Sequence, residues 1–179
     1  MDQISKKIKM ISEKLKELKN KFNLNEIDGY VVPKNDEYFS EFAKKDKLKT
    51  ITGFDGSFGI AIILKKKNFL FVDGRYVEQA KIQAGKKFKI LEIPKKLPYQ
   101  ILNSRLNLGF DPRVFTSRSL IYFFRNKIKL TPINKIIVNS DILNNRTSRK
   151  FYSLNQKVVG ETANLSLIHI SEPTRPYLI

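Results

Sequence analysis

The chain has 179 residues, of which 41% are hydrophobic and 28% charged, and its formal net charge is +17. This composition is typical of a globular rather than a disordered chain, with room for one domain and the start of a second. The absence of cysteine excludes a disulfide framework and a thiolate metal site.

The sequence shows no apolar run long enough to cross a bilayer, and lysines interrupt the N-terminal segment where a secretory signal needs an apolar stretch. We therefore expect a cytoplasmic protein with no membrane partner. The positive charge has two interpretations: an anionic partner, either nucleic acid or a membrane surface, or a lysine-rich coding bias. We favour the bias, because the lysines are spread over several elements and no aromatic RNA-binding pattern accompanies them.

The first predicted element is an amphipathic helix, whose apolar residues recur at steps of four and three: Ile4, Ile8, Ile11, Leu15, Leu18 and Phe22. We expect this stripe to pack on the domain's own sheet; a short coiled-coil seam and a membrane-surface helix are the alternatives. A buried strand is predicted at 27–32, ended by Pro33. Asn35 or Asp36 is then expected to cap a short helix through Ala43, before a polar connection at 44–49.

The next apolar runs, at 58–64 and 69–72, predict an antiparallel hairpin with a polar tip. Asp73 is expected to cap a helix that ends at Ala84 before Gly85. Further strands are predicted at 88–93, 106–110 and 135–138, with a helix from Thr116 or Ser117 to Phe124. This alternation predicts an α/β domain with a mixed sheet.

The end of the chain follows no pattern of this kind. Residues 140–155 are polar and rich in turn formers, and 166–177 resemble the translated adapter or vector sequence found at the ends of unrelated chains. We therefore expect one domain over 1–140, a linker and the start of a truncated second domain over 141–164, and a foreign tail over 165–179. The natural chain is expected to continue beyond residue 164.

Gly53, Gly56 and Gly59 form a glycine-rich segment of the kind that can hold a phosphate. No Gly-Lys-Ser or Gly-Lys-Thr follows them, and a strand is predicted after them where a phosphate loop needs a helix. We predict that these glycines serve the backbone, where positive φ or close approach is needed.

The segment Asp73-Gly74-Arg75-Tyr76 lies at a strand-to-helix junction. Asp73 can cap the helix and Gly74 can make the turn, but neither role explains Arg75, whose planar fork suits a carboxylate. The spacing alone does not decide between a structural role and a ligand-binding role for Arg75 and Tyr76.

Two other groups of polar residues offer little chemistry. An acidic cluster, made of Asp36, Glu37, Glu41 and Asp46, could hold a metal or move protons, but a solvated helix face is the expected interpretation. The single histidine, His169, lies in the suspected tail, so the sequence offers no Ser-His or Cys-His pair. We predict no catalytic and no metal-ligating residue in the chain.

Four blocks resemble, in order, the N-terminal domain of the aminopeptidase P, creatinase and prolidase family (M24 metallopeptidases). They are Asp28-Gly-Tyr-Val-Val-Pro33 with Asp36 and Ser40-Glu41-Phe42; Thr52-Gly-Phe-Asp-Gly-Ser-Phe-Gly59; Val72-Asp-Gly-Arg-Tyr76 with Gln79-Ala80; and Gly109-Phe-Asp-Pro112. The similarity spans about residues 1 to 163. Within the family, the passage into a second domain favours the three-domain Xaa-Pro aminopeptidases.

The resemblance implies an α/β domain with a mixed sheet of about six strands. It implies a parent enzyme that removes the N-terminal residue from peptides with proline second, using two divalent metals, expected to be manganese, in a C-terminal domain absent here. The present domain would contribute to homodimer contacts and cover part of the substrate cleft. Arg75 would line that cleft, Asp73 and Tyr76 would hold its loop, and Asp36 is a weaker candidate.

Some residues depart from the family pattern. Tyr38 stands where many members have histidine, Lys47-Leu48 replaces a common Arg-Arg pair, and the chain has no tryptophan. Two alternatives to the aminopeptidase remain: a free-standing binding module of the same fold, and a basic nucleic-acid-binding domain, which the lysine-rich first helix and the net charge of +17 favour.

Overall fold

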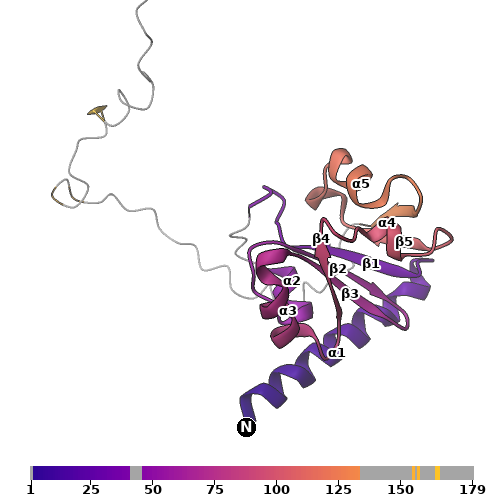
Figure 1. The fold of residues 1–179 in the computed structure, drawn as a ribbon, viewed down its shortest axis with the longest axis horizontal. Helices are drawn as coiled ribbons and strands as arrows, with labels where there is room; N and C mark the ends of the chain where they lie inside the picture. The colour runs from indigo at the N-terminus through magenta and orange to yellow at the C-terminus, as the bar shows by residue number, and fades with distance from the viewer. Residues whose placement is uncertain (1, 41–45, 134–154, 156, 158–163, 166–179) are drawn as a thin grey trace, which may run out of the picture. The chain divides into compact units, whose positions relative to one another are not determined.

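The computed structural model describes residues 2–40, 46–133, 155, 157, 164 and 165. Its centre is a six-stranded sheet in the order β4-β3-β2-β1-β5-β6 (Figure 1). In chain order the strands are β1 (Gly29–Pro33), β2 (Gly59–Leu64), β3 (Asn68–Asp73), β4 (Lys89–Ile93), β5 (Asn107–Phe110) and β6 (Lys129–Pro132). The predicted mixed α/β sheet is confirmed.

The direction of the strands decides where a site can form. β2 is antiparallel to both of its neighbours, β1 and β3, whereas the pairs β3–β4, β1–β5 and β5–β6 are parallel. All strands other than β2 therefore run the same way and end at one edge of the sheet, which we call the carboxyl edge. We call the opposite edge the amino edge. Ligands of open α/β sheets bind outside the carboxyl ends of the strands.

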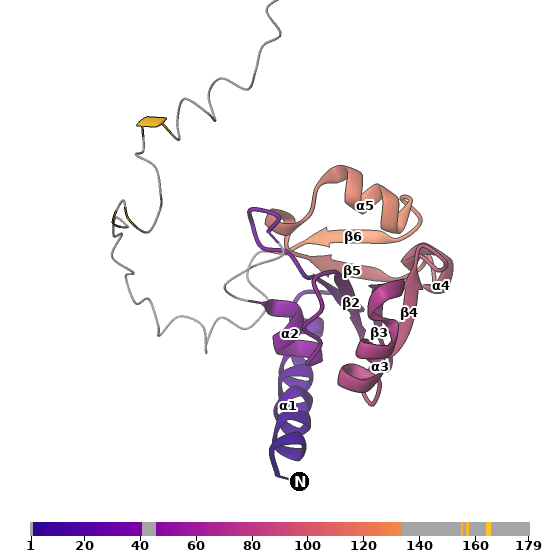
Figure 2. The ribbon, with the colours of Figure 1, turned by 60° about the vertical axis from the view of Figure 1, so that its left-hand side comes forward.

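One face of the sheet is covered by α1 (Asp2–Leu24), α2 (Lys47–Thr52) and α3 (Val77–Ala84) (Figures 1 and 2). The predicted stripe of α1 packs on the sheet as expected: Leu18 and Phe22 are fully buried, and Ile11 and Leu15 nearly so. Burial of each such side chain stabilises the fold by about 1.5–3 kcal/mol.

The other face is covered by α4 (Pro98–Ile101) and α5 (Ser117–Phe124). α5 begins as predicted, because the Thr116 hydroxyl accepts from the Ser119 backbone N–H at 3.1 Å. The central strands supply both cores: Tyr30 and Val32 of β1 face the α1 side, and Val31 faces the α5 side. The short helices η1 (Gly74–Tyr76) and η2 (Pro112–Val114) follow β3 and β5.

The β2–β3 hairpin and the Asp73-capped helix after it are also confirmed. The predicted helix from Asp36 is wrong over 36–40, where the chain forms a turn; its residues 41–45 lie outside the described part. The predicted polar connection at 44–49 is wrong as well, because α2 begins at Lys47. The carboxylate of Asp46 caps it by accepting from the Lys49 backbone N–H at 2.8 Å, and Leu48 and Ile51 bury its apolar side.

β6 forms at 129–132, where no strand was predicted, and the predicted strand at 135–138 lies outside the described residues, as does most of the linker and tail.

Gly85 ends α3 in a right-handed conformation, with φ −59°, so its backbone is not one that requires glycine. No helix among the described residues is long and apolar enough to cross a membrane.

Candidate functional site

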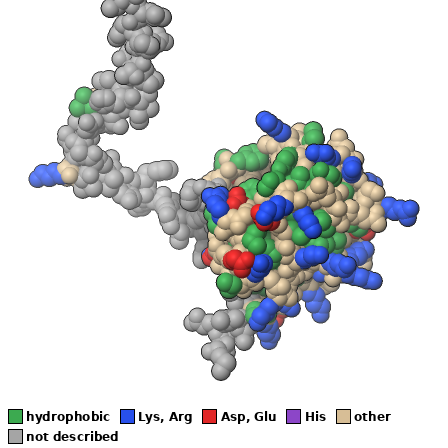
Figure 3. Space-filling view, in the orientation of Figure 1, with side chains coloured by type: hydrophobic (Ala, Val, Ile, Leu, Met, Phe, Trp, Pro, Cys, Tyr) green, Lys and Arg blue, Asp and Glu red, His purple; other side chains and the backbone are tan. Residues whose placement is uncertain are grey.

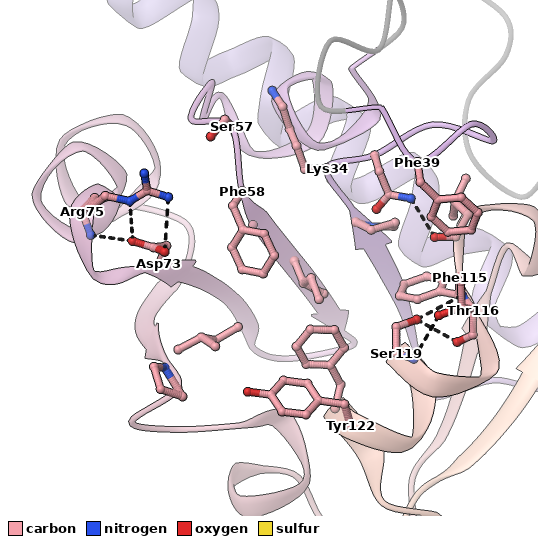
Figure 4. Close-up of a pocket in the computed structure, with 18 residues that line it drawn as sticks. Lys34, Phe39, Ser57, Phe58, Asp73, Arg75, Phe115, Thr116, Ser119 and Tyr122 are labelled. Atoms are coloured by element: carbon pink, nitrogen blue, oxygen red, sulfur yellow. Dashed lines mark hydrogen bonds and ion pairs between the residues drawn. The ribbon is translucent and has the colours of Figure 1, made fainter. Parts of the chain in front are cut away.

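A pocket of about 640 Å³ lies at the carboxyl edge, between the loop after β3 and the start of α5 (Figure 4). The ends of β1, β3 and β4 and the beginning of β2 contribute to it. Its lining residues are Pro33, Lys34, Asn35, Phe39, Ser57, Phe58, Gly59, Ile60, Asp73, Arg75, Ile93, Pro94, Val114, Phe115, Thr116, Ser119, Tyr122 and Phe123. Two of the residues predicted from the sequence, Asp73 and Arg75, are among them.

Asp73 and Arg75 form one rigid turn at the rim of this pocket. The Asp73 carboxylate accepts from the Arg75 backbone N–H at 2.9 Å, from its Nε at 3.0 Å and from its Nη2 at 3.4 Å. These hydrogen bonds from Arg75 hold the pKa of Asp73 below its ordinary value. The Arg75 side chain is nevertheless 74% exposed, so a fixed guanidinium faces solvent at the pocket's edge.

Tyr76 lies behind the pocket and does not line it. Its hydroxyl group is 2.7 Å from Ser57 Oγ, its ring meets Phe54 edge-to-face at 6.0 Å, and the Arg75 guanidinium lies 5.4 Å from the ring centre. Tyr76 therefore fastens the loop that carries Arg75 to the glycine-rich segment, in which Ser57 and Phe58 line the pocket.

The glycine-rich segment has the close contacts that a backbone role requires. Gly53 ends α2 with φ 79°, in the left-handed region. A Cβ at Gly56 would lie 2.2 Å from Phe54 Cζ, and one at Gly59 would lie 3.0 Å from Leu48 Cδ2. At Gly74, by contrast, the nearest atom would be the flexible end of Glu92 at 3.0 Å. The segment leads into β2.

Asp36 is not brought into the pocket. Its carboxylate accepts from the backbone N–H groups of Tyr38 and Ser40, both at 3.0 Å, and so holds the turn after β1. The neighbouring residues Asn35 and Phe39 do line the pocket, and Asn35 Nδ2 donates to the Val114 carbonyl at 2.9 Å. Asp36 thus shapes one wall without facing into it.

The pocket also has an aromatic wall, which sequence reasoning missed. Phe39, Phe58 and Tyr122 are 51%, 39% and 47% exposed around the pocket (Figure 4). Lys34, also missed, lines the pocket and is ion-paired with Asp46. Exposed aromatic residues on a helix and two loops carry no periodic signal, so only the fold could have assembled this wall.

A second turn repeats the Asp73–Arg75 arrangement after β5. The Asp111 carboxylate accepts from Arg113 Nε at 3.0 Å and Nη2 at 2.8 Å, and Lys47 Nζ lies 3.3 Å away. Burial alone would raise the pKa of Asp111, but the hydrogen bonds from Arg113 and the charge of Lys47 outweigh it, so the pKa is lowered. The repeated Asp-x-Arg triplet was a sequence signal for this second turn.

None of this assembles a metal site in the part of the chain that the structure describes, where no three Asp, Glu or His side chains gather closely enough to hold an ion. The described pocket can bind through the exposed guanidinium of Arg75 and an apolar wall. Its residues do not fit a dinuclear metal centre.

Comparison with known proteins gives a consistent family. The sequence profile of the creatinase/prolidase N-terminal domain matches residues 14–140. A probable Xaa-Pro aminopeptidase P from Coprinopsis cinerea is 30% identical over 164 residues, which cover 83% of this chain and 26% of that protein. One from Laccaria bicolor is 41% identical over 109 residues, covering 56% of this chain and 17% of that protein. The chain thus spans about a quarter or less of these relatives.

Two solved structures share the fold. An X-prolyl aminopeptidase from Caenorhabditis elegans, described as a cytosolic enzyme with a di-nuclear active site, has a TM-score of 0.61 and 19% identity, covering 89% of this chain and 30% of that one. The N-terminal domain of a metallopeptidase from Corynebacterium diphtheriae has a TM-score of 0.56 and 18% identity, covering 69% of this chain and 96% of that one. With the profile match over 14–140, the chain belongs to the creatinase/prolidase N-terminal domain family.

Proposed function

We propose that this chain is the non-catalytic N-terminal domain of an Xaa-Pro aminopeptidase. Such an enzyme removes the N-terminal residue from peptides whose second residue is proline. The names of the fungal relatives and the small share of their length that the chain spans support this proposal. The reaction itself would take place in a part of the enzyme beyond this chain.

Within that enzyme, the pocket at the carboxyl edge would cover one side of the substrate cleft. The observation that carries this role is the fixed, 74% exposed guanidinium of Arg75 at the rim of a largely apolar pocket. A guanidinium held in this way can donate to a peptide carbonyl or carboxylate without first losing side-chain freedom. Within the aromatic wall, Phe58 and Tyr122 offer an apolar surface to a proline ring or side chain.

Three other residues would act through Arg75 or through the shape of the pocket. Asp73 would orient the guanidinium, and Tyr76 would hold the loop against the glycine-rich segment. Asp36 would keep the turn that presents Phe39. These are positioning roles, because none of the three needs to touch a substrate.

The family's two metal ions, which we expect to be manganese, would activate the attacking water in the missing catalytic domain. We also propose a homodimeric, cytoplasmic enzyme. The description of the nematode relative as cytosolic and di-nuclear supports the location and the metal count.

The test begins with the reading frame beyond codon 164, followed by expression of the full-length enzyme. Release of the N-terminal residue from Xaa-Pro peptides is the activity to be measured. Replacing Arg75 by alanine should lower kcat/KM by about 10- to 100-fold, mainly through KM, as loss of a charge-assisted hydrogen bond predicts. Arg75→Lys should not restore it, because lysine lacks the planar fork.

The matched control is Arg118→Ala, which removes an exposed cation from α5 outside the pocket lining. It should leave kcat/KM unchanged. An active enzyme whose kcat/KM is the same with and without Arg75 would reject the cleft-covering role, and a full-length product without aminopeptidase activity would reject the proposed enzyme.

A further inference from the structure

The amino edge of the sheet gathers lysines that lie far apart in the sequence. Lys65, Lys66 and Lys67 form the tip of the β2–β3 hairpin, and Lys86, Lys87 and Lys89 lie where α3 leads into β4; all are exposed. The two segments are adjacent, because Asn68 Nδ2 donates to the Lys87 carbonyl at 3.0 Å and Phe69 pairs with Lys89. We call these residues the lysine edge.

α1 extends this surface. Lys19 Nζ donates to the Lys65 carbonyl at 3.2 Å, which places the basic side of the helix beside the hairpin tip. Burial lowers the pKa of Lys19 from its ordinary value, as expected for a cation that is partly shielded from water. On the face in Figure 3, Lys and Arg side chains crowd the right and lower right, whereas most Asp and Glu side chains lie to the left.

Ion pairing differs between the lysine edge and the carboxyl edge. Near the carboxyl edge, Lys34, Lys47 and Lys49 are each paired with an aspartate. Within the part of the chain described, no lysine of the lysine edge has a carboxylate within ion-pair distance. Acids are present at the amino edge, where Glu26 and Asp28 precede β1, but among the described residues neither pairs with a lysine of the lysine edge. The lysine edge is therefore a concentrated positive surface that lacks internal neutralisation.

Exposed apolar side chains adjoin the lysine edge. A groove of about 240 Å³ between α1 and α3 is lined by Ile8, Ile11, Thr52, Ile82, Gln83, Ala84, Lys86 and Lys87. Ile82, four residues before Lys86, is 84% exposed. Apolar side chains flanked by lysines are the combination that favours the interface of an anionic bilayer, where the lysines meet headgroups and the apolar groups enter the acyl boundary.

We propose that the lysine edge, together with Ile82, is a peripheral binding surface for anionic phospholipid membranes. The preference for a lysine-rich coding bias rested on the scatter of lysines along the chain, and the fold brings several of these lysines together at one edge. The strongly exposed aromatic residues of the described chain that could stack on bases are Tyr38, Phe39, Phe58 and Tyr122, and they lie in or next to the pocket at the other edge. This separation favours a lipid surface over a single-stranded nucleic acid.

The test is co-sedimentation of the full chain with vesicles of phosphatidylcholine alone, or of equal parts phosphatidylcholine and phosphatidylserine. Binding is expected to the anionic vesicles only, and to weaken as salt is added. A Lys65→Gln, Lys66→Gln, Lys67→Gln variant should partition about 100-fold more weakly, because each lysine near such a surface contributes about fivefold. The control with equal charge loss, Lys95→Gln, Lys96→Gln, Arg118→Gln, should bind close to the unaltered level. Equal weakening in both variants would overturn the proposal, because it would mean that only net charge matters.

A second variant separates a membrane from a nucleic acid. Ile82→Gln keeps the charge and should weaken vesicle binding severalfold while leaving retention of duplex DNA or RNA unchanged. Full vesicle binding by Ile82→Gln, or binding to nucleic acid without binding to vesicles, would overturn the proposal. Circular dichroism of each variant checks that the fold is retained.

Discussion

The hydroxyl group of Tyr76 lies 2.7 Å from Ser57 Oγ and joins two segments that the sequence separates by 19 positions. One segment carries Arg75, and the other is the glycine-rich entry to β2. The pair sets the distance between the fixed cation and the wall of the pocket that contains Phe58. Similar contacts within the fold lead to specific expectations.

Loss of the Tyr76 hydroxyl should destabilise the domain modestly. Tyr76→Phe keeps the ring contact with Phe54 but removes the hydrogen bond to Ser57, and we expect a loss of about 1 kcal/mol in the free energy of unfolding. Urea denaturation measures it. Tyr122→Phe, which alters an exposed tyrosine, should change the value by less than about 0.5 kcal/mol. Equal effects of the two changes would contradict the structural role of the Tyr76–Ser57 pair.

Asp111 should make stability depend on pH in the acid range. Its pKa is lowered in the folded chain, so the folded state binds fewer protons there than the unfolded state, and the contribution of Asp111 is fully present above the unfolded pKa of about 3.9. That contribution should be lost as the pH falls through the lower, folded pKa.

Asp111→Asn should remove this part of the pH dependence. The same substitution should lower the free energy of unfolding by about 2 kcal/mol at neutral pH. This is less than the full penalty for breaking a buried ion pair, because the Arg113 side chain is 44% exposed. Urea unfolding of both chains between neutral and acid pH tests this. Parallel pH curves for the two chains would show that Asp111 does not contribute.

Gly56 and Gly74 should differ in their tolerance of a methyl group. Gly56→Ala places Cβ 2.2 Å from the Phe54 ring, in a packed region, and should destabilise the fold by about 1–3 kcal/mol. In Gly74→Ala the new Cβ lies 3.0 Å from the movable Glu92 carboxylate, so the free energy of unfolding should fall by less. Thermal unfolding of the two variants side by side gives the comparison. A Gly74 variant that is the less stable of the two would refute this account of the segment.

The stripe of α1 should be essential to the fold. Leu18 is fully buried against the sheet, and Leu18→Ala should lower the free energy of unfolding by about 2–5 kcal/mol. Lys16→Ala, on the exposed side of the same helix, should change it little, because alanine is a good helix former. If both substitutions had small effects, α1 could not be part of the core.

Elements with strong local patterns were predictable. The period of α1, the paired apolar runs of the β2–β3 hairpin, and the caps at Asp73 and Thr116 all depend on residues close together in sequence. The short helix α2 was not predicted, because Asp46 could equally well begin a turn, and the expected helix from Asp36 was lost to side-chain hydrogen bonds with Tyr38 and Ser40. β6 lies at the edge of the described sheet, where it pairs with β5, and its sequence has little hydrophobic alternation. Its formation therefore depends on the pairing with β5.

The residues of the pocket were likewise predictable only where the local sequence carried a signal. Arg75 stood out from the sequence, because neither the helix cap at Asp73 nor the turn at Gly74 required an arginine at that position. Tyr122, Phe39 and Lys34 had no such signal, because each belongs to a different element and only the shared edge of the sheet brings them together.

By itself, the sequence determined the mixed α/β class, the apolar face of the first helix, the hairpin and the family resemblance, since all of these depend on short-range periodicity or contiguous motifs. Only the tertiary structure decided which residues share an edge. The common direction of five strands puts the Asp73–Arg75 turn and the aromatic wall at one end, and the hairpin tip and the α3–β4 loop at the other. Position along the chain carries no information on such neighbours, because hydrogen bonding between strands, rather than chain order, fixes them.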